Sequence, residues 1–242
     1  NKLNKKIEII LIKSKSITLD SLSNDNKLIN ELFIASNGSP LFSESAYPPV
    51  KLWGFVDVLD QKPWESLEKF KSYYEQDHQK SNIIIIDNEL IKPIGILSLC
   101  NNDINNLTIQ IDSIWITPAY QGKKRAHEAL LVILGYLFKL NYRRISIEID
   151  LRHLIAKKLF IRCGFLLEGT LRKHKIINDR NRDTCIYSII NSDWLDVETN
   201  LKKYVGIPTI IKKEKIASID TSIRFTPDLK KENNNNNNNN ND

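Results

Sequence analysis

Hydrophobic and polar positions follow two different periods along the chain, which predicts that strands and helices are interspersed. Short continuous apolar runs and segments in which apolar and polar residues alternate are typical of strands. They occupy residues 6–13, 83–86, 93–99, 107–116, 144–150, 165–177 and 184–190. Apolar residues that recur every three or four positions predict helices instead. They occupy residues 21–35, 64–77, 126–140 and 154–163.

The order of these elements indicates the fold class and the domain organisation. In the second half of the chain a strand, a cation-rich loop, a helix, a strand, a helix and a hairpin follow one another, which is typical of an α+β fold with a mixed sheet. We predict one folded domain over residues 1–200 and a linker or an added strand over residues 201–225. Residues 226–242 are expected to form a disordered tail, because the run Asn233–Asn241 has no apolar surface to bury.

Composition changes this picture little. The 242 residues are 41% hydrophobic and 26% charged, an ordinary balance for a soluble globular protein. Cys100, Cys163 and Cys185 form no CxxC pair, so we expect buried thiols in a reducing, cytoplasmic setting and neither a disulfide framework nor a metal site. No stretch reaches the roughly 18 uninterrupted apolar residues of a membrane span, so no membrane association is expected.

The net charge of +6 admits an anionic partner, and one loop concentrates positive charge. Lys123–Arg125 lie between the predicted strand that ends at Ile116 and the helix predicted from Ala126. The free N–H groups and positive dipole at a helix start bind phosphate, and Gly122 lets the backbone approach a ligand. We interpret the loop as a phosphate site; the alternative is a solvated cationic turn or a nuclear-targeting patch.

A colinear series of short motifs carries a resemblance to a known family. The series comprises Leu52-Trp53, Trp64–Leu67, Ile114–Gln121, Glu128–Leu130, Asn141–Arg144, Gly164-Phe165, Glu168-Gly169 and Arg182-Asp183. It resembles the GNAT acetyltransferases, in the branch similar to ribosomal-protein N-terminal acetyltransferases. The resemblance implies a mixed, mostly antiparallel twisted sheet flanked by helices, with splayed central strands. It also implies acetyl-CoA between those strands as co-substrate.

The same resemblance implies which residues bind the cofactor. The pantetheine arm is expected along Ile114, Trp115 and Ile116. The pyrophosphate is expected on the loop formed by Gln121, Gly122, Lys123, Lys124, Arg125 and Ala126. His127 is expected to contact a phosphate or the adenine, or else to be exposed. His153 stands where the family commonly has a cofactor-contacting Asn and is expected to replace it, or else to be a surface residue.

Several positions depart from the family pattern. Lys124 holds a position that is usually glycine, and Ala156 replaces a frequent Ser. Phe160 stands where many members have a Tyr that could protonate the departing thiolate, and Gln110 stands where a Glu is frequent. An amide cannot act as a general base. These positions therefore favour cofactor binding over catalysis.

Two carboxylates remain as candidates for the proton transfer that direct attack of an amine on a thioester requires. Asp112 or Glu168 would act through a water molecule. The alternatives are a salt bridge or a surface position for Asp112 and a pairing of Glu168 with Arg172 or Arg182. Tyr187 is interpreted as a packed aromatic residue.

Together these observations favour an N-acetyltransferase that moves an acetyl group from acetyl-CoA to a primary amine of a small molecule or a protein. The alternative is a CoA-binding but catalytically weak module with an interaction or regulatory role. A nucleic-acid binder has no support from a recognition motif or from aromatic residues interleaved with the basic loop. The acceptor groove depends on residues 37–49 and 178–181, and the sequence predicts neither the acceptor nor the oligomeric state.

Overall fold

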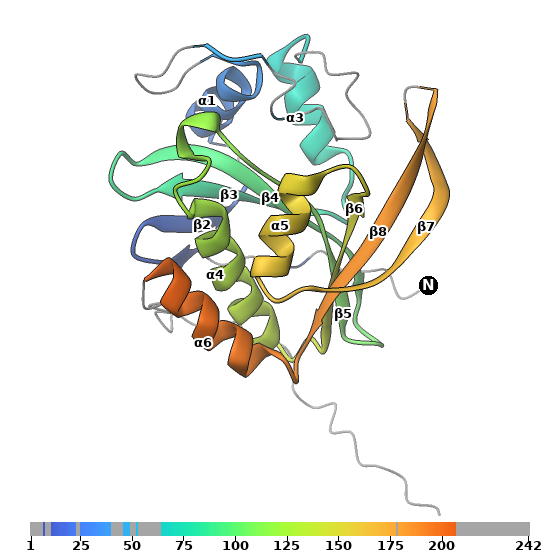
Figure 1. Ribbon diagram of the computed structural model, residues 1–242. Coiled ribbons are helices and arrows are strands. Elements are labelled where there is room, and N and C mark those ends of the chain that lie inside the picture. The colour runs from blue at the N-terminus through green and yellow to red at the C-terminus, as the bar shows by residue number, and fades with distance from the viewer. Residues whose placement is uncertain are drawn as a thin grey trace, which may run out of the picture. The chain divides into compact units, whose positions relative to one another are not determined.

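One mixed sheet of eight strands forms the centre of the part of the chain that the structure describes (Figure 1). The computed structural model describes residues 7, 11–22, 25–39, 46–48, 52, 64–177 and 179–206, all within one compact unit, Asn1–Lys212. In spatial order the strands are β1 (Ile12–Lys13), β2 (Ile17–Ser21), β3 (Ser81–Asp87), β4 (Lys92–Asp103), β5 (Thr108–Ile116), β6 (Arg144–Asp150), β8 (Arg180–Ile190) and β7 (Leu166–Ile177). All neighbours are antiparallel except β5 and β6, which are parallel.

Helices cover both faces of this sheet. The five α-helices of the described ranges are α1 (Asn26–Ser36), α3 (Leu67–Glu75), α4 (Arg125–Lys139), α5 (Leu154–Arg162) and α6 (Trp194–Val205). Residues of α4, α5 and α6 share one hydrophobic cluster with the sheet, and residues of α1 and α3 share a second. The helices α4 and α6 lie side by side (Figure 1).

The two clusters explain the unbroken apolar run in β3. Ile83 and Ile85 are buried in the cluster that contains α4, whereas Ile84 between them is buried with Phe70 of α3. Successive side chains of a strand point to opposite faces. A strand that is covered on both faces therefore needs apolar residues at every position.

The predicted elements between residues 64 and 190 are confirmed within a few residues at their ends, and the strand predicted over 144–150 is β6. The N-terminal part differs. Residues 17–21 form β2, so α1 begins only at Asn26, where the Asp25 side chain accepts hydrogen bonds from the N–H groups of Lys27 and Leu28. Residues 6 and 8–10 of the strand predicted over 6–13 lie outside the described residues.

The helix α6 was not predicted, and it corrects the expected domain boundary. Residues 201–205 continue this helix and are not a linker or an added strand, and Leu201 is buried against the core. Residues 207–225 and the expected disordered tail lie outside the described residues. No helix of the described ranges is long and apolar enough to span a membrane.

All three cysteines are free and buried, as predicted. Burial raises the pKa of Cys100 and of Cys163 to about 12 in each case. The thiolate forms are therefore negligible at neutral pH, and neither thiol is activated as a nucleophile.

Candidate functional site

The site begins where β5 and β6 stop pairing. Their parallel pairing extends over four residues, from Thr108 opposite Arg144 to Ile111 opposite Ile147. Farther along, β5 continues to pair with β4 and β6 continues to pair with β8. The sheet therefore opens in its middle, which confirms the predicted splayed strands.

Two cavities flank this opening. The helix-side cavity, about 420 Å³, is lined mainly by β5, α4 and α5 with Tyr204 of α6. The strand-side cavity, about 340 Å³, is lined mainly by α3, β5 and β6 with residues of β7 and β8. The two cavities have lining residues in common: Leu52, Ile114, Trp115, His153 and Ala156. The cavities therefore meet at the split in the sheet and form one cleft.

The N-terminus of α4 faces the helix-side cavity. The first hydrogen bond of this helix runs from Glu128 N to Lys124 O at 3.0 Å, and no side chain of the described residues caps the helix. The N–H groups of residues 124–127 precede that bond, so they have no partner within the helix, and all four residues line the cavity. Uncapped N–H groups at the positive end of a helix dipole are suited to bind an anion.

Two left-handed residues shape the loop before α4. Gly122 has a φ of +79°, and Lys124 has a φ of +62° at the position that is usually glycine in the family. A non-glycine residue rarely adopts this conformation. The Lys124 ammonium donates a hydrogen bond to the backbone oxygen of Tyr204 at 2.7 Å, a contact that no glycine could make.

The three cations of the loop do not share one role. Lys123 does not line the cavity, and its ammonium lies 4.8 Å from the ring centre of Tyr120. Arg125 lines the cavity, but its guanidinium lies 3.5 Å from the Asp87 carboxylate and 3.8 Å from that of Glu128. Of the three, only Lys124 lines the cavity without an ion pair to a carboxylate in the described ranges. The placement of Lys123 therefore gives no support to the expectation that all three cations face a phosphate, and the charge of Arg125 is already compensated.

The remaining loop residues form the wall of the cavity. The Gln121 side chain donates a hydrogen bond to the Ile116 backbone oxygen at 3.1 Å, which ties the loop to the end of β5. Ala126 lines the cavity in the first turn of α4. Ile114, Trp115 and Ile116 line it from β5.

Both candidate histidines line the cleft. The ring of His127 lies 5.0 Å from that of Tyr204, and burial together with Arg162 and Lys124 lowers the pKa of His127. His153 precedes α5 and lines both cavities. Burial lowers the pKa of His153 against the opposing effect of Asp150. Both imidazoles are therefore neutral at neutral pH.

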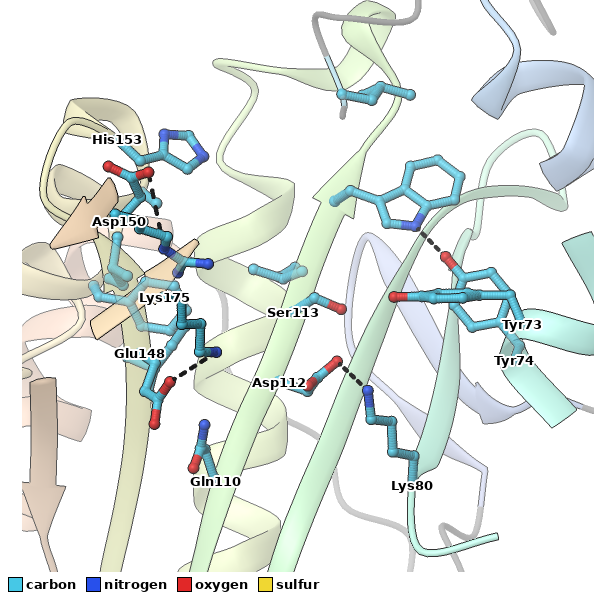
Figure 2. Close-up of a pocket in the computed structure, with 18 residues that line it drawn as sticks. Tyr73, Tyr74, Lys80, Gln110, Asp112, Ser113, Glu148, Asp150, His153 and Lys175 are labelled. Carbon is cyan, nitrogen blue, oxygen red and sulfur yellow. Dashed lines mark hydrogen bonds and ion pairs between the residues drawn. The ribbon is translucent and has the colours of Figure 1, made fainter. Parts of the chain in front are cut away.

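Two carboxylate–lysine pairs face each other in the strand-side cavity (Figure 2). Asp112 of β5 lies 3.1 Å from Lys80, and Glu148 of β6 lies 3.2 Å from Lys175. Burial disfavours the Lys80 ammonium, but the Asp112 carboxylate outweighs this effect and raises the pKa of Lys80. Tyr73 also lines this cavity; burial and the nearby Asp112 raise its pKa, so its phenol stays protonated.

Glu168 is not part of this cleft, so its placement gives no support to the catalytic role expected for it. It lines neither cavity. Its carboxylate forms a bidentate ion pair with Arg144 and accepts a hydrogen bond from Ser188 Oγ at 2.6 Å. The hydrogen bonds from Arg144 lower the pKa of Glu168 despite partial burial. These contacts agree with the alternative of a structural ion pair, and the partner observed is Arg144, whereas Arg172 or Arg182 was expected.

Sequence reasoning missed several residues that line the cleft. They are Tyr73, Tyr74, Glu148, Lys158, Arg162, Lys175 and Tyr204. Two signals were available. Glu148 alternates with the isoleucines of its strand, so it lies on the opposite face of the strand. Lys158 and Arg162 are four residues apart and therefore lie on one face of a helix. Tyr187, in contrast, is buried and lines neither cavity, which confirms that it is a packed aromatic residue.

A mixed sheet that opens between two parallel strands, with a helix N-terminus at the opening, is suited to bind an anionic molecule there. Among solved structures, a GCN5-related N-acetyltransferase from Brucella melitensis superposes with a TM-score of 0.71 over 81% of this chain and 85% of its own, at 24% sequence identity.

Sequence comparisons identify a similar family. The family model described as "Acetyltransferase (GNAT) family" matches residues 50–165, and this segment of the chain is similar to that family. A spermidine N(1)-acetyltransferase of Vibrio cholerae is 26% identical over 140 residues, which cover 56% of this chain and 80% of that protein. A ribosomal-protein-serine acetyltransferase of Escherichia coli is 26% identical over 118 residues, which cover 48% of this chain and 64% of that protein. The family uses acetyl-CoA as co-substrate, and the uncapped N–H groups and the Lys124 ammonium fit its phosphates.

Proposed function

We propose that this protein transfers an acetyl group from acetyl-CoA to a primary amine by direct attack of the amine. One observation carries the proposal: two cavities of different chemistry meet at the split between β5 and β6. The helix-side cavity offers donors for phosphate. The strand-side cavity offers the carboxylates of Asp112 and Glu148, each paired with a lysine, whose oxygen atoms can also accept hydrogen bonds from an amine.

The helix-side cavity would hold the cofactor. The backbone of Ile114, Trp115 and Ile116 lies along the split and would bind the pantetheine arm. The N–H groups at the start of α4, together with Gly122 and Lys124, would bind the pyrophosphate. When bound, acetyl-CoA supplies an acetyl group that is activated as a thioester.

The strand-side cavity would hold the acceptor. An amine must lose a proton to attack, and a carboxylate within reach accepts that proton directly or through one water molecule. Asp112 is our candidate because it lines this cavity on β5, next to the residues that line both cavities. Glu148 lies across the cleft on β6 as a second carboxylate for orienting the cationic amine (Figure 2). Phe160, also in the lining, has no proton to give to the thiolate.

The acceptor class follows from the cavity and from the relatives. The relatives are named for spermidine and for a ribosomal-protein serine. We propose an acceptor with a primary amine and test it with a panel that contains spermidine and a peptide with an N-terminal serine.

Two measurements test the proposal. Calorimetry with acetyl-CoA and CoA should show binding, and release of free thiol should depend on an amine from the panel. Glu75→Gln, an exposed change outside both cavities, is the matched control for Asp112→Asn. Absence of binding at high micromolar ligand would overturn the proposal. Binding without thiol release for any amine would overturn the transfer step and leave a CoA-binding module.

A further inference from the structure

A second group of cations lies in the helix-side cavity, beside the N-terminus of α4. Lys158 and Arg162 project from α5, and both line the cavity together with Lys124 and Tyr204. Lys158 and Arg162 are four residues apart, so they lie on the same face of the helix. Both residues are exposed and therefore accessible to a ligand from solvent.

Tyr204, in the last turn of α6, organises two of these cations. The Arg162 guanidinium lies 4.7 Å from the centre of the Tyr204 ring, and the Lys124 ammonium lies 4.6 Å from it. The backbone oxygen of Tyr204 also accepts the hydrogen bond from Lys124. A cation held over an aromatic ring loses less freedom when it binds a ligand, because it is already oriented.

In the part of the chain that the structure describes, no carboxylate pairs with these cations. Among the described residues, Lys124, Lys158 and Arg162 form no ion pair, whereas Arg125 nearby is paired with both Asp87 and Glu128. Like charges that gather around one ring repel each other unless an anion lies among them. The lowered pKa of His127, caused by burial and by Arg162 and Lys124, reflects the same positive environment.

Coenzyme A carries its phosphates in two separate groups, a pyrophosphate and a monophosphate on the 3′ position of the ribose. We propose that Lys158 and Arg162, with Tyr204 as a positioning residue, bind the 3′-phosphate of coenzyme A while the start of α4 binds the pyrophosphate. This inference rests on the proposed use of acetyl-CoA. It gives α6 a role in the site and predicts that the protein selects CoA over dephospho-CoA, which lacks only that phosphate.

Calorimetric titration of the full chain with CoA and with dephospho-CoA tests the proposal. The wild type should bind CoA at least about tenfold more tightly, since a charge-assisted hydrogen bond is lost with the phosphate. Arg162→Gln and Lys158→Gln should each weaken CoA binding and leave dephospho-CoA binding unchanged. Tyr204→Leu should reduce the ratio of the two affinities, and Tyr204→Phe, which keeps the ring, should preserve it.

Lys157→Gln is the matched control. It removes the same charge one residue away on α5, but Lys157 donates to the Leu151 backbone oxygen at 2.6 Å and does not line the cavity. This variant should keep the wild-type ratio. Lys158 is exposed, so its replacement leaves the fold intact and decides the question even if an Arg162 variant fails to fold.

The possible outcomes separate the two proposals. Absence of binding by both ligands would overturn the proposed function. Equal binding of CoA and dephospho-CoA by the wild type would overturn only the 3′-phosphate site. A preference for CoA that survives in both the Lys158 and the Arg162 variants would also overturn it, because the phosphate would then bind elsewhere.

Discussion

Replacement of Glu128 provides a sharp test of how the N-terminus of α4 is held in place. This carboxylate is 1% exposed, and it accepts hydrogen bonds from Ser14 Oγ at 2.6 Å and from Ser16 N at 3.0 Å. It also lies 3.8 Å from the Arg125 guanidinium. The residue therefore links the start of α4, which faces the helix-side cavity, to the turn between β1 and β2.

These contacts determine how much stability is expected to be lost when Glu128 is replaced. Each hydrogen bond to a charged group contributes about 1.5–3 kcal/mol, and removal of one partner of a buried ion pair costs about 3–5 kcal/mol. Glu128→Ala should therefore lower the free energy of unfolding by about 3–5 kcal/mol, because the effects overlap. In a domain of this size the loss corresponds to a fall in Tm of about 6–20 °C. Glu128→Gln keeps the shape and one acceptor oxygen, so its loss should be smaller.

Urea denaturation and thermal unfolding followed by circular dichroism measure these values. Glu75→Ala, at an exposed helical position, is the control and should change the stability by less than about 0.5 kcal/mol. A double-mutant cycle with Ser14→Ala should give a coupling of about 1.5–3 kcal/mol. A loss below about 1 kcal/mol for Glu128→Ala would refute the assigned anchoring role.

Three other changes test separate parts of the structure. Gly164→Ala should cost about 2–4 kcal/mol, because Gly164 has a φ of +85° and an added Cβ would lie 2.4 Å from Val197 Cγ2; Val197→Ala should restore part of this loss in urea denaturation, and no restoration would contradict the clash. Burial disfavours the Asp150 carboxylate, but hydrogen bonds from Arg152 outweigh this effect and hold the pKa of Asp150 below its usual value. The ionised carboxylate therefore stabilises the fold fully above the unfolded-state pKa of about 4, and this stabilisation is lost as the pH falls through the folded-state pKa. Asp150→Asn should therefore have a lower urea midpoint at pH 7 and approach the wild type in strong acid, and an unchanged gap at low pH would contradict this. Asp112→Asn should lower kcat for thiol release about 10²-fold with unchanged CoA affinity, and an unchanged kcat would exclude Asp112 as the base.

The order and type of most elements could be predicted from the sequence, because apolar residues recur with clear spacing in the strands and in the helices. The strand β2 was missed because Ile17–Ser21 is short and directly precedes a segment with helical spacing. The helix α6 was missed although Trp194, Val197, Leu201 and Tyr204 repeat every three or four residues. That pattern favours a helix, but only the packing against α4 identifies it as part of the domain.

The candidate site was predictable in position and less so in the role of each residue. The start of α4 and the end of β5 were identified from local spacing and from the family pattern. The roles of Arg125 and Glu168 depend on Asp87 and Arg144, which are distant in the sequence. Such pairings arise only when the sheet is assembled, so charge counted along a loop does not show which cation remains available to a ligand.

The four residue pairs between β5 and β6 are also the backbone connection between the two parts of the sheet. On one side of it lie β1–β5 and on the other β6–β8, and in the described ranges no ladder of hydrogen bonds connects β5 to β6 beyond Ile111 and Ile147. Past this point the two parts of the sheet are held together by the hydrophobic cluster that they share with α4. A molecule bound along the inner edge of β5 would then contact both parts of the sheet where they share no backbone hydrogen bonds. The complex would therefore be more rigid than the free protein at this position.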